Sequence, residues 1–173
     1  MRLPLIVLSV VIVAAGVLAL NSGVLRMTPA TSDPPGASAL PLDPESTVGE
    51  LFADHFMNDM GFTPQTVARK RHRLTPDLYQ QIEAYFARPA DPNEAPAING
   101  DPFTNTQEYP SSFEVREGTQ LDTNKARVPA IMTVGPEQRT VQVDLVHEAP
   151  GWLVDDLVYE DGSTFRASLK EQP

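Results

Sequence analysis

Hydrophobic and polar residues alternate most regularly toward the C-terminal end of the chain. Val141, Val143 and Leu145 alternate with polar residues, and a second apolar run follows at 152–159. The Pro-Gly pair between the two runs is typical of a turn. Alternation with a period of two, followed by a turn and a returning apolar run, predicts a β-hairpin.

Apolar residues three or four positions apart predict helices ahead of this hairpin. The first helix is expected to be capped by Ser46-Thr47 and to end at Gly61, and its apolar stripe includes His55. The second helix is expected over 65–72. The third begins at Thr75-Pro76, because proline fits the first turn of a helix.

Four strands are expected after a long proline-rich loop, at 113–117, 126–134, 140–147 and 152–159. Proline cannot donate to a sheet ladder, so Pro129 predicts that its strand lies at an edge or contains a bulge. Helices followed by antiparallel strands predict an α+β fold, in which N-terminal helices pack against a curved antiparallel sheet. We expect a single domain of this kind over residues 45–170.

The N-terminal segment differs from the rest of the chain. Residues 3–20 carry no charge, and these 18 residues approach the ~20 that a helix needs to span a bilayer. Residues 1–20 are therefore predicted to be a retained membrane anchor or a signal peptide cleaved after Ala19. In both cases the positive charge at Arg2 places the domain outside the cytoplasm. Residues 21–44 are rich in proline and serine, which predicts an extended linker.

Composition narrows the possible partners and chemistry. The chain carries a net charge of −10, which repels phosphate backbones and argues against a nucleic-acid partner. It contains no cysteine, which excludes disulfides, thiolate metal sites and cysteine nucleophiles. The short basic run 69–73 predicts a solvated helix end rather than a docking patch. The sequence contains no cofactor fingerprint, so we expect no cofactor.

Adjacent acids in the last predicted strand are the main candidates for chemistry. Neighbouring residues of a strand face opposite sides, so Asp155 and Asp156 cannot share one proton. The same alternation places Asp156 on the side of Trp152 and Val154. There a carboxylate either acts as a general base or accepts backbone hydrogen bonds that hold the sheet in place.

The proline-rich loop supplies further polar candidates. Asp101 and Gln107 are expected either to line the mouth of a pocket or to satisfy the backbone of the loop. With Trp152, Asp156 and Tyr159 they form our candidate ligand-binding set, which is alternatively a structural polar cluster. The three histidines lie on different predicted elements without metal-ligand spacing. We therefore expect no metal site and assign no catalytic residue.

Four stretches of the chain, in their order, resemble a known family. They are Leu51-Phe52 with His55-Phe56, Leu74 to Leu78, Asp101-Pro102-Phe103 with Gln107 to Pro110, and Trp152 to Leu157. Their order resembles the bacterial domain-of-unknown-function family 3828, within the nuclear-transport-factor-2-like (cystatin-like) superfamily. The family more often has Asp where this chain has Glu108. The resemblance implies a cystatin-like α+β cone in the cell envelope and transfers no catalytic residue.

Three functions remain open at this point. The first is a non-enzymatic envelope domain, anchored in the inner membrane through residues 3–20, which binds an unknown protein or small molecule on the periplasmic side. The second is an immunity or inhibitor protein that blocks a secreted enzyme, for which strong negative charge is suitable. The third is an isomerase- or hydrolase-type enzyme that uses Asp156 in an apolar pocket.

Overall fold

The structure, a computed structural model, describes residues 43–58, 60–89 and 96–171. In chain order its elements are α1 (Pro44–Asn58), α2 (Pro64–Lys70), the 3-10 turn η1 (Arg71–Arg73), α3 (Pro76–Phe86), β1 (Ser112–Val115), β2 (Thr119–Asp122), β3 (Lys125–Val134), β4 (Glu137–Glu148), β5 (Gly151–Val158) and α4 (Phe165–Ser168). Helices therefore precede an antiparallel sheet and pack on it, which confirms the predicted α+β class.

The anchor or signal segment expected at 1–20 lies outside the described residues, as does the expected linker up to residue 42. Within the described part of the chain, no helix combines the length and the apolar character that crossing a membrane requires. The first helix, α1, begins at Pro44, which is the last residue of the expected linker.

Short polar side chains begin the helices. Asp43 accepts a hydrogen bond from the Ser46 amide at 2.8 Å, so the expected cap at Ser46-Thr47 is wrong and the helix starts earlier. An Asp carboxylate followed by proline is a strong start signal, because the proline is already shaped for the first turn. The expected starts of α2 and α3 are confirmed, since Thr63 and Thr75 accept from amides in their first turns.

The sheet has the strand order β1-β3-β4-β5, and β2 pairs with β3 beside β1. The prediction that the strand of Pro129 lies at an edge or bulges is wrong, because β3 has partners on both sides and keeps its register with β4. Pro129 lies between the part of β3 that pairs with β1 and the part that pairs with β2. In that gap the Pro129 carbonyl accepts a hydrogen bond from the Arg116 amide at 2.9 Å. Neither β1 nor β2 pairs with Pro129, so neither strand needs the N–H that proline lacks.

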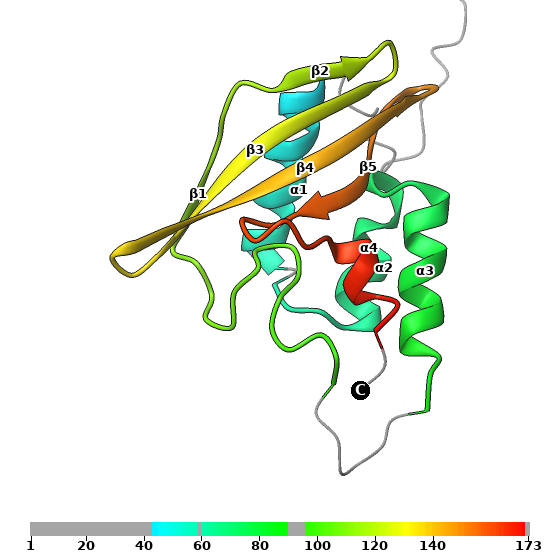
Figure 1. Cartoon of the computed structure of the whole chain (residues 1–173), viewed down its shortest axis with the longest axis vertical. Helices are drawn as coiled ribbons and strands as arrows, with labels where there is room; N and C mark the ends of the chain where they lie inside the picture. The colour runs from blue at the N-terminus through cyan, green and yellow to red at the C-terminus, as the bar shows by residue number, and fades with distance from the viewer. Residues whose placement is uncertain (1–42, 59, 90–95, 172–173) are drawn as a thin grey trace, which may run out of the picture. The chain divides into compact units, whose positions relative to one another are not determined.

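The core lies between the sheet and the helices. Figure 1 shows α1 crossing one face of the sheet, while α2, α3 and α4 group beyond β5. Val128 and Val143 are fully buried on the face toward the helices. Phe103, from the loop between α3 and β1, is also fully buried, with its ring 5.3 Å from His55 and 5.8 Å from Phe165. This aromatic packing fills the space between helices and sheet.

Trp152 tests the packing of the last hairpin. Only 7% of this residue is exposed, which confirms that it is buried. Trp152→Ala should lower the free energy of unfolding by about 3–5 kcal/mol, because it removes a large ring from the core. Urea denaturation of the full-length chain, followed by circular dichroism, measures this change.

Leu121→Ala is the control, since Leu121 is 52% exposed and its truncation should cost less than about 0.5 kcal/mol. Equal stability of Trp152→Ala and the wild type would contradict the packing described for β5.

Candidate functional site

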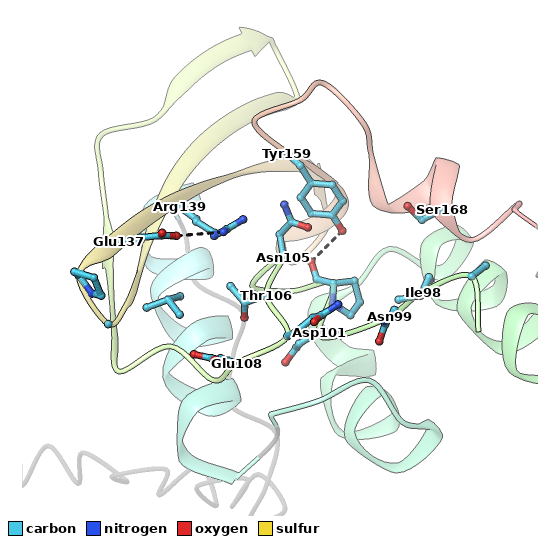
Figure 2. A pocket seen from close by; sticks show the side chains of 17 residues that line it. Ile98, Asn99, Asp101, Asn105, Thr106, Glu108, Glu137, Arg139, Tyr159 and Ser168 are labelled. Carbon is cyan, nitrogen blue, oxygen red and sulfur yellow. Dashed lines mark hydrogen bonds and ion pairs between the residues drawn. The ribbon is translucent and has the colours of Figure 1, made fainter. Parts of the chain in front are cut away.

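A polar hollow lies between the loop that precedes β1 and the turn that joins β3 to β4 (Figure 2). Its lining residues are 97–102, 105–108, 134–137, Arg139, Tyr159 and Ser168. Figure 2 shows Glu137 and Arg139 on the strand side and Asn99 and Asp101 on the loop side. The volume of about 680 Å³ falls within the range of ~300–1,000 Å³ that is typical of ligand sites.

Backbone hydrogen bonds between Asp101 and Thr106 close the loop at the rim of the hollow. The Asp101 amide donates to the Thr106 carbonyl at 2.8 Å, and the Thr106 amide donates back at 3.4 Å. Gly100 has a φ of 116°, and a Cβ there would lie 2.6 Å from the Thr106 oxygen. Only glycine fits this backbone, so the loop has one defined shape beside the hollow.

The carboxylate of Asp101 fastens this loop to the core. Its Oδ2 accepts from the Gly61 amide at 2.8 Å, and its Oδ1 accepts from the Phe103 amide at 3.0 Å. His55 of α1 brings its Nε2 to 2.8 Å from the same Oδ2. Helix α1, the turn that follows it and the loop at the hollow therefore meet at one carboxylate.

The His55–Asp101 pair is sealed from solvent. The two side chains are 0% and 4% exposed. The short approach of Nε2 to Oδ2 lacks the alignment of a hydrogen bond, and among the described residues neither ring nitrogen has an aligned partner. A catalytic pair must touch its substrate, so this buried pair fits a structural role.

Tyr159 lies at the base of the hollow. Its hydroxyl donates to the Pro102 carbonyl at 3.0 Å, and the residue is 8% exposed. Burial raises the pKa of this phenol far above its usual range, and the carboxylates of Asp156, Asp101 and Asp161 raise it further. The hydroxyl therefore stays protonated and fastens the loop, and it is unsuited to act as a base.

A β-bulge in β5 changes the direction in which its acids face. The pairing of β5 with β4 shifts by one residue, so Asp155 is left without a partner of its own. Beyond the bulge Leu157 takes the buried position, while Asp156 lies beside Asp144 on the opposite face. The prediction that Asp156 shares the face of Trp152 is wrong, because strict alternation does not continue through a bulge.

Both acids of the bulge hold the C-terminal helix. Asp156 Oδ1 accepts from the Arg166 amide at 3.0 Å and from the next amide of its own strand at 2.8 Å. Asp155 Oδ1 accepts from Arg166 Nη2 at 2.6 Å and from the Thr75 hydroxyl at 2.9 Å. These bonds match the alternative in which Asp156 accepts backbone hydrogen bonds and holds the sheet in place.

Two residues of the basic run 69–73 are folded against the protein. Lys70 is 1% exposed, and its ammonium group donates to a helix carbonyl at 3.2 Å. Arg73 is 7% exposed and donates to the carboxylates of Glu50 and Asp54 on α1. The prediction of a solvated helix end is confirmed for the three exposed residues, Arg69, Arg71 and His72. It is wrong for Lys70 and Arg73, and two acids one helical turn apart on α1 hold Arg73.

The structure brings together three of the five candidate site residues. Asp101, Gln107 and Tyr159 line the hollow. Trp152 is buried at the other end of the last hairpin, and Asp156 is bonded to the start of α4. The candidate set is therefore divided between the rim of the hollow and the structural contacts of β5.

Sequence reasoning does not find the strand side of the hollow. Glu137 and Arg139 reach it because Gly135-Pro136 turns the chain between β3 and β4. Gly135 has a φ of 56°, and a Gly-Pro pair between two apolar strands is a readable turn signal. That signal gives the position of the turn along the chain, but it does not show that the turn folds beside the loop at 97–108.

Apart from the buried Asp101, the charged groups of the hollow are exposed. Glu108 is exposed, and the side chains of Glu137 and Arg139 are 67% and 46% exposed and lie 3.3 Å apart. An exposed ion pair of this kind contributes little to stability, so both groups can exchange partners. Within the described ranges no three His, Cys, Asp or Glu side chains are grouped to hold a metal ion. The arrangement suits reversible polar contacts with a ligand.

Asp101→Ala tests the anchoring of the loop. It should lower the free energy of unfolding by about 2–5 kcal/mol, because two backbone amides lose their acceptor and His55 loses the carboxylate that lies against it. Asp101→Asn should cost less, since it keeps one acceptor oxygen. Glu148→Ala, on the exposed end of β4, is the control, and urea denaturation measures all three. An Asp101→Ala variant as stable as this control would rule out the anchoring role.

Tyr159 should make stability fall at alkaline pH. The pKa of its phenol is raised in the folded protein above the ordinary value of 10.0, so the folded state keeps the proton that the unfolded chain releases. This contribution is fully present below pH 10.0 and is lost as the pH rises beyond it. Tyr159→Phe should therefore flatten the alkaline fall in the free energy of unfolding.

Denaturation at a series of pH values from neutral to strongly alkaline measures this slope. Tyr109→Phe is the matched control, since Tyr109 is 66% exposed. Identical alkaline slopes in Tyr159→Phe and the wild type would contradict the burial of a protonated phenol.

Comparison of the chain with protein-family models, with curated proteins and with solved structures finds no match. The resemblance to the bacterial domain-of-unknown-function family 3828 therefore stays a prediction, and the function is argued from the hollow itself.

Proposed function

We propose that this chain is a non-enzymatic binding protein of the bacterial cell envelope, and that the hollow holds its protein or small-molecule partner. Residues 3–20 hold the chain at the inner membrane, with the folded domain on the periplasmic side. If the segment is a signal peptide, cleavage releases the same domain in soluble form. In both cases the hollow faces a compartment outside the cytoplasm.

One observation supports this proposal above the others. The groups suited to catalysis are engaged beneath the surface, where His55 and Asp101 are sealed and Tyr159 keeps its proton. The groups at the hollow, such as Gln107 and Glu108, are exposed polar side chains on a loop of fixed shape. A loop of fixed shape favours binding, because its backbone loses little conformational entropy when a partner docks.

We also propose that the fold is the cystatin-like cone and that the chain is related to family 3828. The helices that come first and the packing of α1 across an antiparallel sheet support this proposal. The buried loop residues 101–103 coincide with one of the stretches that carry the resemblance.

Photo-crosslinking tests the binding role. The full-length chain is produced in its own cells with a photoreactive amino acid at Gln107, which is exposed at the hollow. Irradiation should give a defined adduct, because a partner in the hollow lies against this position. Mass spectrometry of the purified protein measures the added mass.

Leu121 on β2 is the control position, since it is also exposed but lies outside the hollow. An adduct at both positions would indicate non-specific contact. Irradiation that gives no adduct at Gln107 would reject the hollow as the binding site.

A further inference from the structure

Negative charge predominates around the hollow. Glu108 and Glu137 line it, and among its described lining residues Arg139 is the one with a cationic side chain. Arg139 already lies 3.3 Å from Glu137. Beside them, Glu160 accepts a hydrogen bond from the backbone amide that follows Arg139, at 2.9 Å. The rim therefore presents more carboxylates than cations.

Carboxylates also lie near the base of the hollow. Tyr159 is hydrogen-bonded beneath it, and the pKa of its phenol is raised first by burial and then by three carboxylates, those of Asp156, Asp101 and Asp161. These three acids lie in β5, in the loop before β1 and in the turn after β5. Asp101 is itself 5% exposed, so solvent screens this carboxylate weakly.

The size and polarity of the hollow favour a cationic side chain on a polypeptide over a single small cation. A volume of about 680 Å³ is far larger than a single metal ion or ammonium group requires. The amides of Asn99, Asn105 and Gln107 line it together with the carboxylates. Side-chain amides pair with peptide groups through both a donor and an acceptor, and carboxylates pair with lysine and arginine.

We infer that the hollow binds a basic segment of a partner polypeptide, with lysine or arginine side chains placed between Glu108 and Glu137. This inference rests on the proposed function, because it names the partner of the same hollow. The net charge of −10 on the whole chain also draws a basic partner toward it from a distance. An anionic partner would be attracted by Arg139 but repelled by Glu108 and Glu137.

Titration calorimetry with defined peptides tests the inference. The probes are three capped octapeptides in which glycine alternates with lysine, serine or glutamate, added to the full-length protein in a neutral detergent. The lysine peptide should bind at least about tenfold more tightly than the serine peptide, because each lysine meets a field of opposite sign. The glutamate peptide should bind least.

Paired variants show whether the hollow is responsible. Glu108→Gln with Glu137→Gln should weaken the binding of the lysine peptide about fivefold, since two exposed carboxylates lose their charge. Glu117→Gln with Glu148→Gln removes the same charge from exposed positions outside the hollow and should change the affinity less than about twofold. All four positions are exposed, so both variants should keep the wild-type melting temperature.

Equal weakening in the two variants would overturn the inference, because the lysine peptide would then be responding to the overall charge. A serine peptide that binds as tightly as the lysine peptide would also overturn it, while leaving a polar binding site in the hollow. If none of the peptides binds, the basic partner is rejected. The crosslinking result at Gln107 then decides the proposed function separately.

Discussion

The carboxylate of Asp101 is the contact on which the shape of the hollow depends. It accepts from the amides of Gly61 and Phe103 and lies against His55, so it links α1, the turn after α1 and the loop before β1. A buried carboxylate is stable only when donors surround it. The residues that contact it come from three segments, so the position of the loop depends on the packing of α1.

The same loop separates the packed interior from the outer site. Phe103 points into the core and is fully buried, whereas Gln107 and Glu108, a few residues later, are exposed at the rim. The bond from the Tyr159 hydroxyl to the Pro102 carbonyl holds the base of this boundary. Packing inside the domain therefore determines where exposed polar side chains such as Gln107 and Glu108 stand, although these two residues lie outside the core.

Local signals in the sequence account for much of the fold but for less of the site. Proline after threonine marks the starts of α2 and α3, and alternation marks the long strands. The strand β2 is exposed at every position, so it carries no alternation and is not predicted. The bulge at Asp155 has no local signal either, because it depends on how β5 pairs with β4. One such residue is enough to reverse the side on which Asp156 lies.

The distribution of charge connects these structural points to the proposed role. Acids that stabilise the fold have donors close to them, as Asp155 has Arg166 and Thr75, so their charge is largely compensated locally. The negative charge of the carboxylates at the rim is compensated less, since the cation beside Glu137 is the exposed guanidinium of Arg139, at 3.3 Å. Exposed carboxylates of this kind contribute little to stability. The surplus of acids beside the hollow is therefore better explained by a basic partner than by stability.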